Sequence, residues 1–162
     1  MKQESSRAYR DTDADALWQM LEPVFRAGET YAIDSGISRQ AGLAYWLAGR
    51  AYVAEVDGSL AGSFYIQENR PGGGAHYCNC GFVTAQSAAG TGVARAMLED
   101  ALARARTLGF LGMVFNFVVA TNTRAIDIWQ RAGFDVVGRV PGAFQPPSGG
   151  AVDALVMYRS LE

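Results

Sequence analysis

The feature that most constrains the fold of this chain is a glycine turn that leads into a long helix and lies between two apolar strands. The turn is QSAAGTG at 86–92, and a helix is predicted over 92–109. One face of this helix is apolar, which is typical of a helix that packs on a core, and Gly109 is a residue that commonly ends helices. Apolar strands are predicted at 75–84 and 110–120. This order of elements indicates helices that pack against a sheet.

The rest of the chain continues the alternation of strands and helices. Further helices are expected at 12–28 with Thr12 as cap, at 38–49 with Ser38 as cap, and at 123–134. Strands are expected at 7–10, 135–140 and 152–161, and a hairpin at 51–69 turns at Asp57-Gly58. No internal repeat or linker divides the pattern. The sequence predicts a mixed α/β layout around one sheet, as a single domain over 1–162.

Composition and charge exclude several function classes. The chain has 162 residues, 49% hydrophobic and 19% charged, which is the composition of a globular protein. A net charge of −2 leaves no basic face for nucleic acid. The first ten residues lack the apolar core of a signal peptide, and the longest apolar run is too short to span a bilayer. We expect a cytoplasmic protein with no nucleic-acid or membrane partner. The two cysteines, Cys78 and Cys80, agree with a reducing compartment.

The glycine turn has the features of a backbone anion site. A helix start offers unpaired N–H groups and a partial positive charge. Gly90 and Gly92 remove the side chains that would hold an anion away. Backbone alone can therefore bind a phosphate here. The alternative is a tight strand-to-helix turn without a ligand, and the turn by itself does not decide between the two.

The order of motifs along the chain resembles the GNAT acyltransferases, which bind acetyl-CoA. The family's loop pattern, Arg/Gln-x-x-Gly-x-Gly/Ala, falls on 89–94, where Gly92 and Ala94 match and Ala89 replaces the Arg or Gln. Asn122, Ala125 and the AGF segment at 132–134 match the next part of the family pattern. The resemblance covers roughly 8–160. It implies a mixed central sheet of about six or seven strands, about four helices on both of its faces, and splayed fourth and fifth strands.

A narrower resemblance concerns the GNAT subgroup that contains the yeast proline-analogue acetyltransferase and many bacterial relatives. Asn79, Asn116 and Asn122 fall on the asparagines of that subgroup with the same spacing. The resemblance implies that Asn79 and Asn116 hold the carboxylate or amine of the acceptor. It also implies that Asn122 contacts the pantetheine arm near the thioester. These three are the candidate catalytic residues. The implied acceptor is a small amine, an amino acid or an imino acid, in a role such as detoxification of amino-acid analogues.

The same resemblance assigns the coenzyme site. It implies that backbone groups of Phe82 and Thr84 bind the pantetheine amides, and that an N–H near Phe82 or Val83 faces the thioester oxygen. Trp129 stands where many GNAT enzymes have a Tyr that protonates the leaving thiolate, and an indole N–H only donates. We therefore expect Trp129 to pack against the coenzyme, and Arg95 to replace part of the charge missing at Ala89. The candidate coenzyme-binding residues are Phe82, Val83, Thr84, Ala89, Gly90, Thr91, Gly92, Val93, Ala94, Arg95, Asn122, Ala125 and Trp129.

The candidate acceptor site adds Tyr31, His76 and Phe117 to Asn79 and Asn116. His76 is the only histidine, and it reads either as a general base or as an ordinary surface side chain. Residues 116, 118, 120 and 122 share parity on the predicted strand. We therefore expect Asn116 and Asn122 to line one side of the same cleft.

Two rival functions remain at the level of sequence. Ala89 and Trp129 also fit a GNAT module that binds acyl-CoA without transferring it. Cys78 and Cys80 suggest a redox or metal protein, but with His76 they are too widely spaced along one strand for an ordinary zinc site. We predict no metal. By resemblance to a family in which dimers are common, a homodimer is the expected assembly.

Overall fold

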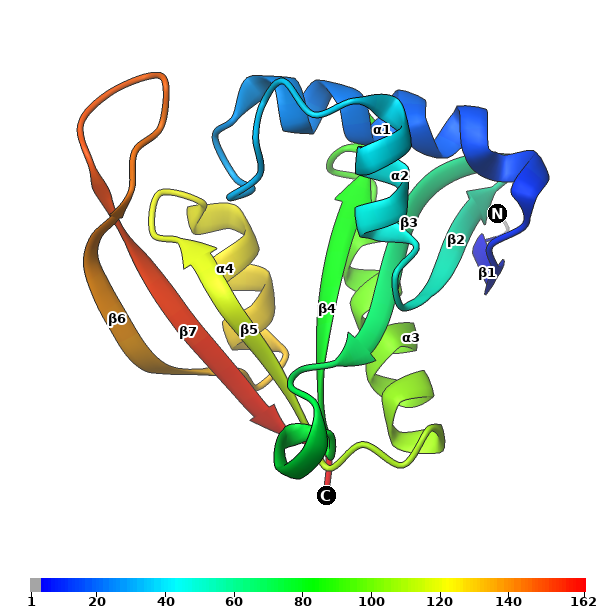
Figure 1. Ribbon diagram of the computed structural model, residues 1–162. Helices are drawn as coiled ribbons and strands as arrows, with labels where there is room; N and C mark the ends of the chain where they lie inside the picture. The colour runs from blue at the N-terminus through cyan, green and yellow to red at the C-terminus, as the bar shows by residue number, and fades with distance from the viewer. Residues whose placement is uncertain (1–3) are drawn as a thin grey trace.

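The glycine turn and the helix after it connect two neighbouring strands of a seven-stranded sheet. These two strands diverge from one another. The computed structural model describes residues 4–162. The sheet order is β1-β2-β3-β4-β5-β7-β6, and only the β4–β5 pair is parallel (Figure 1). The strands are β1 (Glu4–Ala8), β2 (Arg50–Val56), β3 (Ser59–Glu68), β4 (Tyr77–Thr84), β5 (Gly112–Val119), β6 (Asp135–Phe144) and β7 (Val152–Ser160). The expected mixed sheet is confirmed.

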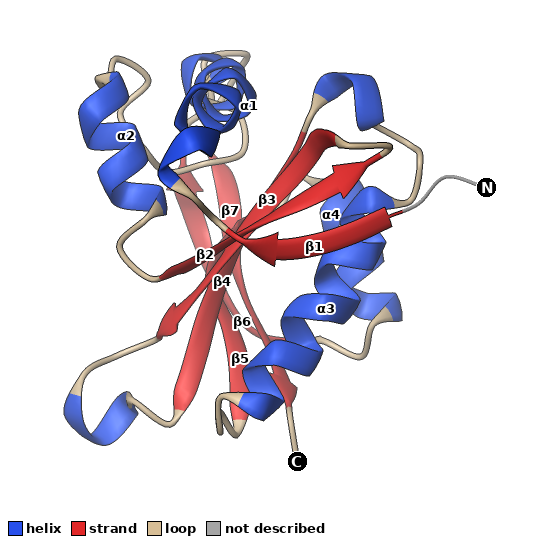
Figure 2. Cartoon of the chain, turned by 90° about the vertical axis from the view of Figure 1, so that its right-hand side faces the viewer, coloured by secondary structure: helices blue, strands red, loops and turns tan. Residues whose placement is uncertain are grey.

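The four α-helices cover both faces of the sheet, two on each (Figure 2). On one face, α1 (Ala14–Ala27) and α2 (Arg39–Trp46) bury Leu17, Leu21 and Trp46 in a cluster that reaches Tyr65 of β3. On the other face, α3 (Val93–Thr107) and α4 (Thr123–Arg131) pack in a second cluster with the sheet. Each face therefore has its own core. None of the helices in residues 4–162 is long and apolar enough to cross a membrane.

Two of the predicted local signals are present as expected. The Ser38 hydroxyl accepts a hydrogen bond from the Ala41 amide at 3.1 Å, as an N-cap does. Asp57 and Gly58 have φ values of 51° and 80°, the left-handed pair that a two-residue hairpin turn requires. The 38-helix and the hairpin are thus set by short-range chemistry.

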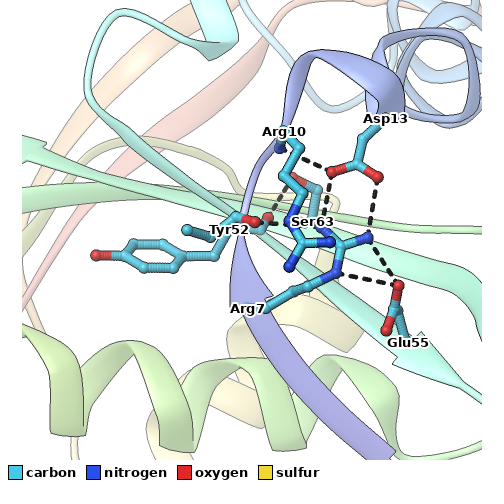
Figure 3. Close-up of polar contacts among 7 residues, drawn as sticks. Arg7, Arg10, Asp13, Tyr52, Glu55 and Ser63 are labelled. Atoms are coloured by element: carbon cyan, nitrogen blue, oxygen red, sulfur yellow. Dashed lines mark hydrogen bonds and ion pairs between the residues drawn. The ribbon is translucent and has the colours of Figure 1, made fainter.

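The start of the chain differs from the prediction. β1 covers Glu4–Ala8 rather than 7–10, and Thr12 lies inside a 3₁₀ turn, Asp11–Asp13, instead of capping α1. Asp13 is the residue that organises this turn, because its carboxylate accepts from the Arg10 amide and pairs with Arg7 (Figure 3). The Arg10 bond is a local capping contact, whereas the Arg7 pair joins β1 to this turn and was not predicted.

The splay of β4 and β5 is confirmed and begins close to the start of both strands. They pair only at Tyr77–Gly112 and Cys78–Met113, and then separate toward the α1 end of the molecule (Figure 1). At the point of separation the Asn79 side-chain amide donates to the Val114 carbonyl at 2.9 Å. Beyond that bond, no strand in the described chain covers the β5-facing edge of β4.

β5 contains a bulge that the parity argument did not foresee. Phe115 pairs with Met157 and Val118 pairs with Leu155, so β5 has one residue more than β7 between these pairs. Phe115 and Val118 consequently share the core beside α3 and α4, although their numbers differ by three. The expectation of one uninterrupted parity from 116 to 122 is wrong for this reason.

Candidate functional site

A cavity of about 670 Å³ occupies the space between the diverging strands. Its walls come from β4, β5, the glycine turn, α4 and the loop that follows α1. Two residues predicted for the site, His76 and Thr91, do not line it. The predicted residues that do line it are Tyr31, Asn79, Phe82, Val83, Thr84, Ala89, Gly90, Gly92, Val93, Ala94, Arg95, Asn116, Phe117, Asn122, Ala125 and Trp129.

The glycine turn presents unpaired amides to this cavity. Gly90 and Gly92 have φ values of 74° and 93°, a conformation that strains other residues. The amides of Ala89 and Thr91 donate within the turn, to Gln86 O at 3.2 Å and Ala88 O at 3.3 Å, so they are not free for a ligand as we had expected. Among the described residues of the turn and the start of α3, the amides of Gly90, Gly92, Val93 and Ala94 have no backbone partner.

Two arginines lie beside the turn. Arg95 on α3 forms an ion pair with Glu99 at 3.0 Å, and its side chain is 80% exposed. Arg124 lies on the first turn of α4 and lines the same cavity. A Cβ placed on Gly90 would be 3.5 Å from a guanidinium nitrogen of Arg124, so this side chain lies directly over the turn. Both cations are close enough to influence an anion on the free amides.

The open edge of β4 supplies backbone groups to the middle of the cavity. The Tyr77 carbonyl accepts from Asn69 beyond β3, whereas the His76 carbonyl accepts from Leu111 at the start of β5. Because backbone direction alternates along a strand, Phe82 and Thr84 direct their groups toward β5, into the gap. Val83 directs its N–H toward β3. Of the two amides that we considered for the thioester oxygen, Phe82 is therefore the one that faces the cavity.

Three tyrosines form the wall on the α1 and α2 side. The Tyr31 hydroxyl donates to the Phe82 carbonyl at 2.5 Å, and the hydroxyls of Tyr45 and Tyr65 lie 3.4 Å apart. Burial raises the pKa of Tyr31 and of Tyr65 well above the usual value for a phenol. These hydroxyls therefore stay protonated at neutral pH, where they act as hydrogen-bonding groups and not as bases.

The three predicted asparagines lie around the same cavity, and two of them bind other residues through their side chains. The Asn79 side-chain amide donates to Val114 O, and the Asn116 side-chain amide donates to Asn69 Oδ1 at 2.7 Å. No buried side-chain oxygen or nitrogen in residues 4–162 lacks a partner, so the Oδ1 atoms of Asn79 and Asn116, for which no bond is found, are not fully buried. Asn122 is the N-cap residue of α4, yet its side chain makes no cap bond and lines the cavity.

Several other candidates take structural positions. His76 is exposed and its ring packs on Tyr77 with centroids 4.5 Å apart, outside the cavity. Trp129 packs on Phe115 with ring centroids 4.4 Å apart and also faces the cavity. Cys78 and Cys80 are free and buried, and burial raises the pKa of the Cys80 thiol. No Asp, Glu or His lines the cavity, and residues 4–162 contain no cluster of three metal-ligating side chains.

Sequence reasoning missed three contributors to the site. Asn69 lies just after β3, and no motif pointed to its contact with Asn116. Tyr65 alternates along a strand like any core residue, so its place in the cavity had no local signal. Arg124 did have a local sequence signal. It follows Asn122 by two residues, in the first turn of a helix that contains part of the family pattern.

Comparison with known proteins identifies the family. The sequence profile of the acetyltransferase (GNAT) family matches residues 14–134. N-acetyltransferase aca1 of Schizosaccharomyces pombe is 40% identical over 85 residues, and this stretch spans 52% of the present chain but only 41% of the yeast protein. The structure of a GCN5-related N-acetyltransferase from Kribbella flavida is 39% identical, covers 97% of both chains and superposes with a TM-score of 0.92.

More distant structures share the fold. The yncA protein of Salmonella typhimurium, solved with its cofactor acetyl-CoA, has a TM-score of 0.87 at 19% identity and covers 99% of this chain and 95% of its own. The splayed strands, the glycine turn and the sequence matches agree with one another. The chain belongs to the acetyltransferase (GNAT) family.

Proposed function

We propose that the cavity between β4 and β5 is the site at which this chain transfers the acetyl group of acetyl-CoA to a small amine or imino acid, by direct attack of the amine on the thioester. GNAT acetyltransferases use acetyl-CoA as the acetyl donor, and it supplies an activated thioester when bound. The observation that carries the proposal is that the free amides of the glycine turn and the open edge of β4 face one continuous cavity. An anion and an extended amide chain can thus be held together.

The residues of the cavity suit the shape and polarity of coenzyme A. The amides of Gly90, Gly92, Val93 and Ala94 form a cradle that a side chain at either glycine would disturb, which fits a pyrophosphate. Phe82 and Thr84 offer backbone groups along the open strand edge, which fit the amides of pantetheine. The Asn122 side chain makes no cap bond to α4 in the described residues, which suits a contact farther along the pantetheine arm.

The acceptor half of the cavity is aromatic and uncharged. It is lined by Tyr31, Tyr45 and Tyr65, together with Asn79 and Asn116. Each asparagine NH₂ group uses one of its two donors on a protein oxygen, and the Oδ1 atom beside it suits the N–H group of an amine. This supports a role for Asn79 and Asn116 in orienting the nucleophilic nitrogen. An amino-acid analogue or cyclic imino acid remains the preferred acceptor, and a detoxifying role rests on that identity.

Proton transfer in this site does not depend on a protein acid or base that lines the cavity. Trp129 replaces the tyrosine of other family members, and burial raises the pKa of Tyr31 and Tyr65, so both phenols stay protonated. We propose that the amine loses its proton to solvent before attack, that the C–S bond breaks as the C–N bond is made, and that coenzyme A leaves as the thiolate and takes a proton from solvent. Positioning and the Phe82 amide supply the rate enhancement.

The direct test is a turnover assay with the intact chain. Acetyl-CoA is mixed with azetidine-2-carboxylate, proline, primary amino acids and simple amines, and the released thiol is followed. Acetylation of one acceptor class supports the proposal. Acetyl-CoA binding in a calorimeter without turnover on any member of the panel would instead favour the alternative, a module that binds acyl-CoA without transferring it. The homodimer and the cytoplasmic location stay predictions.

A further inference from the structure

The glycine turn lacks the Arg or Gln with which its sequence pattern begins, and the structure indicates which residue replaces it. Ala89 takes the place of the Arg or Gln and is exposed. The turn beside it has unpaired amides but no charge of its own. An anion bound only by backbone amides loses the stronger, charge-assisted bonds that a guanidinium supplies. A nearby cation is therefore the missing part of this site.

Arg124 satisfies the geometric requirement for that cation better than Arg95 does. Its guanidinium lies over the face of Gly90, 3.5 Å from the point where a Cβ would be. Within residues 4–162 it has no carboxylate partner, whereas Arg95 is paired with Glu99 at 3.0 Å. A guanidinium already held by a carboxylate must give up that bond to bind a phosphate. Arg124 gives up none in the described chain.

We propose that Arg124 binds the pyrophosphate of coenzyme A on the glycine turn and replaces the side chain that is absent at Ala89. The inference rests on the proposed coenzyme function of the cavity. The pyrophosphate is favoured over the 3′-phosphate because the guanidinium lies against the turn that carries the free amides. Arg124 also follows Asn122 by two residues, at the same helix start. Phosphate binding at Arg124 therefore fixes the backbone that positions Asn122 beside the pantetheine arm.

The first experiment measures binding of coenzyme A and 3′-dephospho-coenzyme A to the wild type and to Arg124→Ala by calorimetry. Arg124→Ala should weaken both ligands by the same factor, about tenfold to a hundredfold, as expected for loss of a bond to a charged group. Weakening of coenzyme A alone would place Arg124 on the 3′-phosphate and overturn the proposal. An unchanged affinity for both ligands would also overturn it.

Matched variants separate this effect from charge or folding. Arg131→Ala removes an equal charge from the same helix, at an exposed residue that pairs with Asp127 and does not line the cavity. It should leave both affinities within about twofold, since it lies outside the first turn of the helix. Arg95→Ala should weaken binding less than Arg124→Ala, because its guanidinium is paired, and an equal or larger effect would reassign the role. Arg124 is exposed, so the melting temperature of the apo variant should match the wild type.

A rescue experiment tests the substitution directly. Ala89→Arg should restore most of the affinity lost in Arg124→Ala, but should add less in the wild type, because the two guanidinium groups then compete for the same phosphate oxygens. An equal gain in both backgrounds would mean that Arg124 acts elsewhere. If the wild type binds neither ligand, the coenzyme function itself fails, and that result is distinct from all of the above.

Discussion

At the scale of single residues, Gly81 determines the shape of the cavity wall that contains Tyr65. It pairs with Tyr65 across β3 and β4, and the phenol ring lies over the space that a side chain would fill. A Cβ at Gly81 would be 2.4 Å from Tyr65 Cε1. Glycine is needed there for close approach and not for a special φ. The Tyr65 hydroxyl can thus reach its position in the cavity because Gly81, on the neighbouring strand β4, has no side chain.

Gly81→Ala should raise the KM for the acceptor by about tenfold, with acetyl-CoA affinity changed less than twofold, because Tyr65 must leave its place. Overpacking of this kind should also lower the free energy of unfolding by about 1–3 kcal/mol. Steady-state kinetics and urea unfolding measure the two effects. Gly138→Ala on β6 is the control, since its Cβ would meet Val156 at an ordinary 3.7 Å. An unchanged acceptor KM in Gly81→Ala would contradict the assignment of Tyr65 to the acceptor wall.

Asp13 is a second residue with a large structural effect. Its buried carboxylate pairs with Arg7 at 2.8 Å and accepts from the Arg10 amide, while Arg7 also binds Glu55 on β2 (Figure 3). The bond to Arg7 lowers the pKa of Asp13 below its usual value. The carboxylate is therefore charged in the folded state throughout the neutral range, and it ties β1, β2 and the start of α1 together.

Asp13→Asn should lower the free energy of unfolding by about 2–4 kcal/mol at pH 7, because it leaves Arg7 without its main partner. Because the pKa of Asp13 is lowered in the folded state, its ionised carboxylate stabilises the fold above the unfolded pKa of 3.8. This stabilisation is lost as the pH falls through the folded-state pKa. The difference in free energy of unfolding between variant and wild type should therefore disappear at acidic pH. Urea unfolding from pH 7 to pH 2 measures it. Asp15→Asn, at a carboxylate 80% exposed, should cost no more than about 1 kcal/mol. A gap that stays constant into acid would contradict this account.

At the scale of elements, the separation of β4 from β5 creates the site. Two residue pairs hold the strands together, and the Asn79 side chain then replaces a backbone donor by bonding to Val114 O. On β5, Asn116 is held by Asn69 from the end of β3. Both asparagines thus line the cavity. Each donates one side-chain N–H to a protein oxygen, and its Oδ1 accepts no bond within the described residues.

Asn79→Ala and Asn116→Ala should each lower kcat/KM for the acceptor by about tenfold or more, because the amine loses an orienting acceptor. Acetyl-CoA affinity should stay within about twofold. Asn69→Ala should give a smaller loss of the same kind, because Asn69 only positions Asn116. Acceptor kinetics and acetyl-CoA calorimetry separate the two effects. If acceptor use and acetyl-CoA binding fall together, the asparagines are structural supports of the splay.

Element boundaries were predictable where a local signal set them. Ser38 and Asp57-Gly58 act through hydrogen bonds or φ values of their own neighbours, and the sequence located both. β1 and the start of α1 were misplaced because Arg7 and Asp13 satisfy each other across elements. The bulge in β5 was missed because it is defined only against β7. Family resemblance pointed to Asn79, Asn116 and Asn122. It did not point to Asn69 or Tyr65, whose places beside the cavity depend on tertiary contacts.

At the scale of the whole molecule, the chemical character of the cavity follows from which elements surround it. Walls from both layers of helices and from the three strands β3, β4 and β5 contribute aromatic, amide and backbone groups. The only charged side chains among the lining residues are Arg95 and Arg124 at the coenzyme end. His76, which we considered as a base, lies outside. The pH dependence of catalysis should therefore be a property of the acceptor.

The kcat/KM for the acceptor should rise about tenfold per pH unit below the pKa of the acceptor amine and become level above it. Two acceptors whose amines differ in pKa should show breaks that move by the same difference. Steady-state rates from pH 6 to pH 10 measure this, and His76→Gln should leave the profile unchanged. A break that stays at one pH for both acceptors would reveal an ionising protein group and contradict the proposed proton path.

The sequence by itself determined the order of elements, the glycine turn and the family, because each depends on short-range periodicity, backbone conformation or a linear motif. Only the tertiary structure decided what the site contains. The guanidinium of Arg124 over Gly90, which has no carboxylate partner in the described residues, and the phenol of Tyr65 over Gly81 join segments far apart in the chain. Such relations arise from packing, which fixes distances that no local pattern of residues specifies.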